Sequence, residues 1–216
     1  MIPKTIQTKL DEGRQYRDFS LGGFERRSDD DEKRTVQGYA TIFDEPYELY
    51  SFDGYTVLEQ IDSKAFDETD LSDVIMQYNH EGRVFARVGN KTLEVEPDDK
   101  GLFIRANLDG TELGRQVWEE IEGGYTTKMS FGFRVKEDKR EITEDRENNT
   151  VTVLRTITKI EKLYDVSAVS LPANDATSIS ARSFGEGVIA EIKEERLARE
   201  ERERQKHKIK ILTEVL

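Results

Sequence analysis

Residues 126–133 read TTKMSFGF, and this stretch decides how the middle of the chain folds. With the two-residue period of a β-strand, Met129, Phe131 and Phe133 lie on one face, and Ser130 and Gly132 lie on the other. The apolar face predicts a strand anchored in a core. The other face carries only a hydroxyl and bare backbone, so it is either solvated or closely approached by another group.

Similar short runs of branched and aromatic residues flank this strand on both sides. They cover residues 35–43, 55–61, 72–79, 83–89, 91–96, 101–108, 150–160 and 163–174, with Gly-, Asn- and Pro-containing turn signals between several of them. Residues 62–70 predict one short helix with Ser63 as its N-cap, and residues 111–124 predict an amphipathic helix. We expect a mainly β fold of the α+β class. Its core is an antiparallel barrel or sandwich, and we favour a barrel-like core.

The composition changes near both ends of the chain. Residues 1–33 include a mixed charge cluster and predict a loosely ordered, charged arm. Residues 34–182 predict the β-rich domain. Residues 183–216 favour a helix and are densely charged, which predicts a solvated helical tail that docks on a partner, with a disordered tail as the alternative.

Composition also excludes several classes of function. The formal net charge of −12 disfavours binding to a nucleic-acid backbone, and no apolar run is long enough to predict a membrane span. The chain has no cysteine, so thiolate catalysis and cysteine metal sites are excluded. It has two histidines, one of them in the tail, which is too few for a typical zinc site. The sequence also lacks a glycine-rich phosphate-binding loop, so we expect no nucleotide cofactor.

Three residues are candidates for chemistry, and each has a plainer interpretation. His80 follows an apolar strand, on the alternation face of Val74, Met76 and Tyr78; it is either a structural residue or a general base. Ser130 is either an ordinary outward serine or a nucleophile whose neighbour Gly132 lets a peptide backbone approach. Asp165 is a single carboxylate in an apolar strand, and it pairs either with a histidine or with a Lys or Arg on a neighbouring strand.

The order of several segments resembles the tailed-phage prohead proteases, which are distantly similar to the herpesvirus assemblins. The resemblance rests on VQGYATIFDEP (36–46), LEQIDSKAFDE (58–68), the Asn-His block and hairpin of residues 76–108, KMSFGFRV (128–135) and LYDVSAVSLPAN (163–174). It implies an assemblin-like fold, His80 as general base and Ser130 as nucleophile. It implies Asp165 as the group that orients His80, at a position where family members often carry Glu. Backbone N–H groups just beyond Pro172 are the expected oxyanion donors, by analogy with the assemblins.

The resemblance further implies a serine endopeptidase of capsid maturation, without a cofactor. Its expected substrates are the scaffolding portion of the major capsid protein, internal scaffold and the protease itself. Its expected location is the host cytoplasm and then the interior of the prohead. The sequence leaves the oligomeric state open, with a homo-oligomer among the alternatives. The rival hypotheses are a non-catalytic scaffold or adaptor, and a protease whose tail acts as a short fused scaffold.

Overall fold

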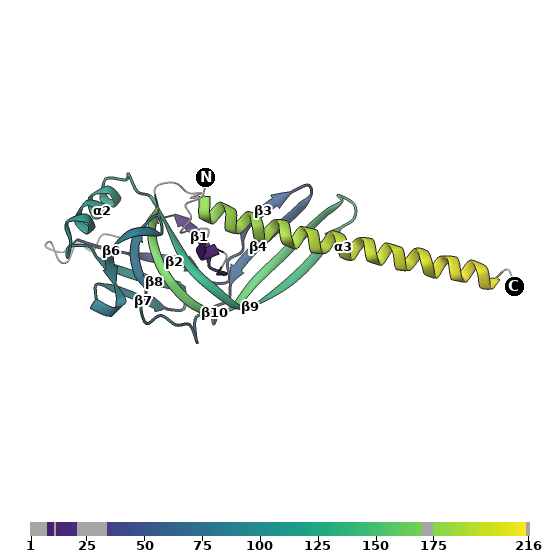
Figure 1. Ribbon diagram of the computed structural model, residues 1–216, viewed down its shortest axis with the longest axis horizontal. Coiled ribbons are helices and arrows are strands. Elements are labelled where there is room, and N and C mark those ends of the chain that lie inside the picture. Colours follow the sequence, from purple (N-terminus) through teal and green to yellow (C-terminus); the bar gives the residue numbers. More distant parts are fainter. Residues whose placement is uncertain (1–7, 11, 21–33, 170–174, 215–216) are drawn as a thin grey trace.

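The computed structural model describes residues 8–10, 12–20, 34–169 and 175–214 of the chain (Figure 1). In chain order the elements are β1 (Gln15–Ser20), β2 (Thr35–Ile42), β3 (Tyr47–Phe52), β4 (Tyr55–Ile61), β5 (Ile75–Tyr78), β6 (Glu81–Arg87), a 3-10 helix (Val88–Asn90), β7 (Leu93–Pro97), β8 (Gly101–Asn107), α2 (Glu112–Glu122), β9 (Lys128–Asp145), β10 (Thr150–Val169) and α3 (Asp175–Glu214). The mainly β, α+β class expected from the sequence is confirmed.

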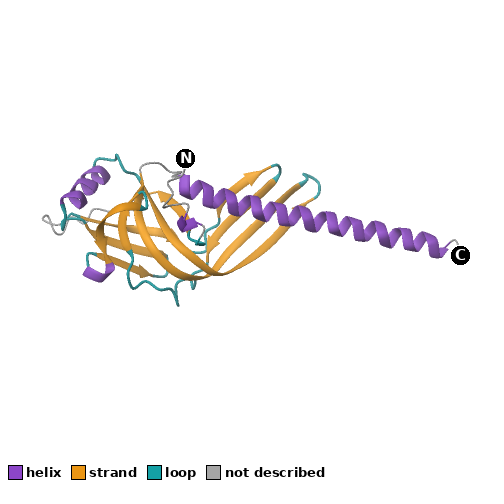
Figure 2. Cartoon of the chain, viewed as in Figure 1, coloured by secondary structure: helices purple, strands orange, loops and turns teal. Residues whose placement is uncertain are grey.

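The described strands form two sheets (Figure 2). The larger sheet has the order β1-β9-β10-β4-β3, and β5 pairs with β10 and carries β6; the smaller sheet has the order β2-β8-β7. β10 runs antiparallel to β9 but parallel to β4 and β5, so the larger sheet is mixed. The purely antiparallel prediction is therefore wrong, because side-chain alternation carries no information on strand direction. The pairings of the described strands also do not close into a barrel.

One long strand, β10, joins the two ends of the larger sheet. Residues 151–157 pair with β4, and residues 165–168 pair with β5 along the same edge of the strand. β9 pairs along the opposite edge for almost the whole length of β10. The sequence predicted two separate strands here, at residues 150–160 and 163–174. The structure instead has one continuous strand, β10, and the charged second half of its partner β9 is held by the backbone ladder.

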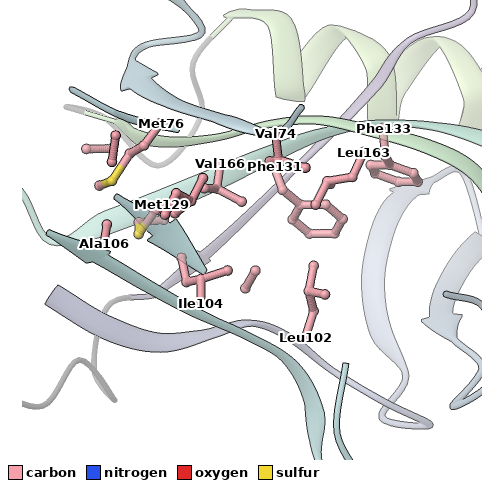
Figure 3. Packing of buried hydrophobic residues seen from close by; sticks show 14 of the residues in the cluster. Val74, Met76, Leu102, Ile104, Ala106, Met129, Phe131, Phe133, Leu163 and Val166 are labelled. Carbon is pink, nitrogen blue, oxygen red and sulfur yellow. The ribbon is translucent and has the colours of Figure 1, made fainter. Parts of the chain in front are cut away.

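The main core lies between the two sheets, and it buries the apolar face predicted from residues 126–133. Figure 3 shows side chains from β9, β10 and β8 packed together: Met129, Phe131 and Phe133 with Leu163 and Val166, and facing them Leu102, Ile104 and Ala106. This face of β9 is fixed by burial of large apolar side chains, which is the dominant favourable contribution to folding.

The two predicted helices within the domain have different outcomes. Residues 63–68 form successive turns rather than a helix, and the Asp62 side chain, not Ser63, accepts the Lys64 backbone N–H at 2.8 Å. An aspartate that bonds the backbone two residues ahead favours a turn over a helix. The helix at residues 111–124 is confirmed as α2, with the Thr111 side chain as its N-cap.

The charged tail is helical, as predicted, and its first part packs on the chain's own sheet. Val188, Ile189 and Ile192 of α3 are buried against a second small core formed by β4 and β10. Leu197, further along, is 66% exposed, and Figure 1 shows the rest of the helix projecting beyond the sheets. Among the described helices, none combines the length and the apolar character needed to cross a bilayer.

The larger sheet contains a buried ion cluster that ties β1 to its centre. β1 lies within the arm that the sequence predicts to be loosely ordered, and its Arg17 is 3% exposed. Arg17 donates two hydrogen bonds to Glu59 of β4, at 2.5 and 2.8 Å, and Arg155 of β10 donates a third at 2.7 Å. Burial raises the pKa of Glu59, but the two guanidinium groups and the Tyr47 hydroxyl outweigh it and lower that pKa to about 2.

Acid should destabilise the fold through Glu59. Its folded-state pKa of about 2 lies below the usual 4.5, so the carboxylate stabilises the fold above that usual value. This contribution is lost as the pH falls from 4.5 towards 2. Thermal unfolding followed by circular dichroism at a series of pH values measures the loss.

Glu59→Gln should lower the free energy of unfolding by about 3 kcal/mol at neutral pH, because it removes the anion that buried Arg17 pairs with and one of the two anions that buried Arg155 pairs with. Glu94→Gln is the matched control, since its 3.0 Å pair with Arg105 is largely exposed and is worth less than about 1 kcal/mol. Equal stability of Glu59→Gln and wild type, with an unchanged response to acid, would contradict the assignment.

Docking of α3 should also be measurable. Ile192→Ala removes buried apolar contacts and should cost about 2 kcal/mol or more in urea denaturation. Leu197→Ala, on the exposed part of the same helix, should change stability by less than about 0.5 kcal/mol. If both substitutions have the same small effect, the first part of α3 does not pack as described.

Candidate active site

The face of β9 opposite the core carries the candidate site. Ser130 pairs with Ser167 of β10, and Gly132 pairs with Asp165. Directly paired residues on neighbouring strands point to the same face of a sheet. Ser130, Gly132, Ser167 and Asp165 therefore share one face, and all four are buried.

Gly132 is explained by what fills the space above it. A Cβ atom at this position would lie 2.6 Å from Asp165 Oδ2 and 2.9 Å from Tyr16 Cε1. The close approach expected from the sequence is therefore real, but in this structure the neighbour is the chain itself rather than a substrate backbone. A side chain at residue 132 would displace the carboxylate, the tyrosine ring or both.

His80 reaches this face because the backbone turns abruptly after β5. Asn79 and His80 both have left-handed conformations, with φ of 49° and 62°. Asn79 donates its backbone N–H to the Ala168 carbonyl at 2.9 Å, which fixes the turn against β10. The prediction that His80 continues the alternation of Met76 and Tyr78 is therefore wrong, because two left-handed residues break the period and carry the imidazole to the opposite face.

His80 and Asp165 form a buried hydrogen-bonded pair. His80 Nδ1 lies 2.5 Å from Asp165 Oδ1, and the Ser167 hydroxyl donates to the same oxygen at 2.7 Å. Of the two alternatives for Asp165, the structure shows the pairing with a histidine. Arg14 also lies 3.7 Å from Oδ2, but it precedes β1 and does not lie on a strand next to β10. Burial raises the pKa of Asp165, but His80, Ser167 and Arg14 together lower it below its ordinary value.

The pair fixes which nitrogen of His80 is available as a base. An ionised carboxylate only accepts hydrogen bonds, so Nδ1 carries the proton and the lone pair lies on Nε2. Nε2 is buried and has no hydrogen-bond partner among the described residues. Such a nitrogen can take a proton from a hydroxyl group. The hydrogen bond between Ser130 and His80 that acyl transfer needs is not formed in this arrangement.

The N-terminal segment covers the site, which the sequence did not predict. The Tyr16 ring of β1 packs on the His80 ring with centroids 4.3 Å apart, and Lys9 Nζ donates to the His80 carbonyl at 2.7 Å. His80 and Ser130 are 0% exposed and Asp165 is 1% exposed. Residues 15–20 show no regular apolar alternation, and a six-residue strand in a charged segment is too weak a pattern to identify. The expected oxyanion donors beyond Pro172 lie outside the described residues.

Comparison with known proteins identifies the family. The family model described as caudovirus prohead serine protease matches residues 23–189, which is most of the chain and includes His80, Ser130 and Asp165. No curated protein and no solved structure matches the chain. Because this family model covers more than half of the chain, the chain belongs to the caudovirus prohead serine protease family.

Proposed function

We propose that this chain is the serine endopeptidase that matures a phage prohead, with Ser130 as nucleophile, His80 as general base and Asp165 as the group that orients His80. The observation that carries the proposal is the state of His80. Its Nδ1 is held by a buried carboxylate and its Nε2 has no hydrogen-bond partner among the described residues. Family membership supports a serine peptidase of capsid maturation.

The chemistry follows from this geometry. His80 Nε2 accepts the proton of the Ser130 hydroxyl while Oγ bonds to the scissile carbonyl carbon. Asp165 stabilises the imidazolium that forms, and it keeps Nδ1 as the donor. The imidazolium then protonates the departing amine as the C–N bond breaks. Water, deprotonated by the same Nε2, hydrolyses the acyl-enzyme and restores both side chains.

Ser167 has a positioning role in this proposal. It pairs with Ser130 across the strands and donates to the Asp165 oxygen that also binds His80. This second donor restricts the carboxylate to one rotamer, so the imidazole is oriented before substrate arrives. The assemblin-like character of the domain is likewise a proposal, supported by the placement of the serine and the carboxylate on neighbouring strands.

The proposed substrates are the scaffolding portion of the major capsid protein, internal scaffold and the protease itself, inside the prohead. Enclosure in a shell raises the effective concentration of enzyme and substrate, so weak binding is sufficient. The proposed division is an arm at residues 1–33, a protease domain at 34–182 and a tail at 183–216. The exposed end of α3, including Leu197, suits the tail to contact other prohead components.

Ser130→Ala should abolish maturation when the chain is co-expressed with its capsid protein. Removing the nucleophile or the base should lower cleavage by about 10³-fold or more, and Ser130→Ala combined with His80→Ala should be no slower than either single change. Gel electrophoresis and mass spectrometry of the capsid protein measure this. Ser51→Ala, on the exposed strand β3, is the control and should cleave normally.

A fluorophosphonate probe should label Ser130 in the wild type and leave Ser130→Ala unlabelled. Normal maturation by Ser130→Ala would refute the peptidase assignment. Arrest of assembly on deletion of residues 185–216, with Ser130→Ala still maturing normally, would instead favour the non-catalytic adaptor.

Gly132→Ala should disturb the His80–Asp165 pair. Its Cβ would push on Asp165 Oδ2 or the Tyr16 ring, and a displacement of about 1 Å can cost about 10²-fold in rate. The added methyl should also remove the low-field proton NMR signal of His80 Nδ1–H. Gly187→Ala is the matched control, because a Cβ there meets nothing within 4 Å. Full activity and an unchanged signal in Gly132→Ala would show that the pair does not depend on this space.

A further inference from the structure

The edge of β9 beside Ser130 is occupied by β1. The two strands are antiparallel, with Asp18 directly paired with Ser130 and Tyr16 directly paired with Gly132. Neighbouring strands lie about 4.8 Å apart, so the backbone of β1 runs beside the serine. An extended peptide paired on this edge would likewise run beside Ser130.

β1 also covers the face of β9 that carries the candidate site. Tyr16 leans across the side-chain-free Gly132 and packs on His80. Arg14 lies 3.7 Å from Asp165 and its guanidinium lies over the Tyr164 ring at 3.7 Å. An imidazolium at His80 would have to share the charge of Asp165 with this arginine. The covered arrangement therefore excludes a substrate and also weakens the electrostatic support for the proton transfer.

We propose that β1 is a tethered competitor of the substrate: it occupies the β9 edge on which an extended peptide pairs, and it holds the enzyme in a self-inhibited state until it is displaced. This inference rests on the proposed function, and it adds the mode of substrate binding and its regulation. Adding a strand to an exposed sheet edge is a common way to bind extended peptides, since the backbone supplies the affinity.

β1 is suited to leave without unfolding the sheet. It is six residues long, it lies at the end of the strand order, and among the described strands it pairs only with β9. It precedes the region matched by the family model, which begins at residue 23. Its strongest anchor is Arg17 on Glu59, but Glu59 keeps its 2.7 Å ion pair with Arg155 when Arg17 departs. Release therefore leaves no unpaired buried carboxylate at the centre of the sheet.

A reversible cross-link tests the proposal. The chain has no cysteine, so Ser20→Cys with Lys128→Cys introduces one disulfide across a directly paired position of β1 and β9. Directly paired residues of antiparallel strands have Cα separations of about 4.5–5.5 Å, which a disulfide can span. Ser51→Cys with Thr56→Cys is the matched control, because it cross-links β3 to β4 at another directly paired position.

The readout is the rate of fluorophosphonate labelling at Ser130 and the cleavage of the capsid protein. We expect the oxidised β1–β9 cross-link to slow both by at least about ten-fold relative to the reduced form of the same protein, as local opening is blocked. The control cross-link should change neither by more than about two-fold. Equal rates for the oxidised and reduced β1–β9 protein would overturn the proposal while leaving the proposed function intact. Absence of labelling and cleavage in every reduced form would instead overturn the proposed function, and this inference with it.

Two substitutions test the cover without a cross-link. Tyr16→Ala removes the ring over His80 and should raise the labelling rate several-fold. Tyr16→Phe keeps the ring that packs on His80 and should label like the wild type. A Tyr16→Ala protein that labels no faster than Tyr16→Phe would contradict the inhibitory role of this side chain.

Discussion

A hydrogen bond between an imidazole and a carboxylate, both removed from solvent, constrains this part of the molecule. Burying an ionised carboxylate is costly unless hydrogen bonds and a positive partner compensate it. His80, Ser167 and Arg14 supply that compensation for Asp165. In doing so they fix the tautomer of His80. The same contacts that make the buried carboxylate tolerable therefore prepare the ring for proton transfer.

The long strand β10 makes this arrangement possible. It pairs with the serine strand on one edge and with the strand leading to His80 on the other. Asp165 lies on β10 itself, so the positions of all three candidate groups depend on this one strand. The opposite face of the same strands is packed in the main core, which keeps the strands from shifting relative to one another. Rigidity of the site thus comes from apolar packing on the face that performs no chemistry.

The burial of the site and the proposed activity are reconciled by the position of β1. A peptidase that works inside an assembling shell benefits from remaining inactive until its substrates surround it. An edge strand that competes with substrate provides such control without a separate inhibitor. The buried ion cluster around Glu59 opposes release, and its second arginine makes release tolerable. Stability and control are therefore set by the same group of charges.

Much of the domain could be predicted from local patterns. Alternation identified the strand that carries Ser130 and its apolar face, and helix α2 followed from its cap and its amphipathic spacing. The turn that Asp62 forms in place of a helix and the full length of β9 were not predicted. In the first case a side-chain hydrogen bond outweighs helix propensity. In the second, the charged half of the strand is held by backbone pairing with β10 rather than by burial. The polarity of residues 136–145 gave no period to detect.

By itself the sequence determined which residue types were available: a serine on a strand with a bare glycine beside it, one histidine outside the tail and one carboxylate in an apolar run. Only the tertiary structure decided how they meet. Two left-handed residues carry His80 to the face of Asp165, parallel pairing places β5 beside β10, and β1 covers the result. Periodicity along a chain reports which face is buried, but it does not report strand order, strand direction or which distant segment fills the space above a glycine, because those depend on contacts between residues far apart in sequence.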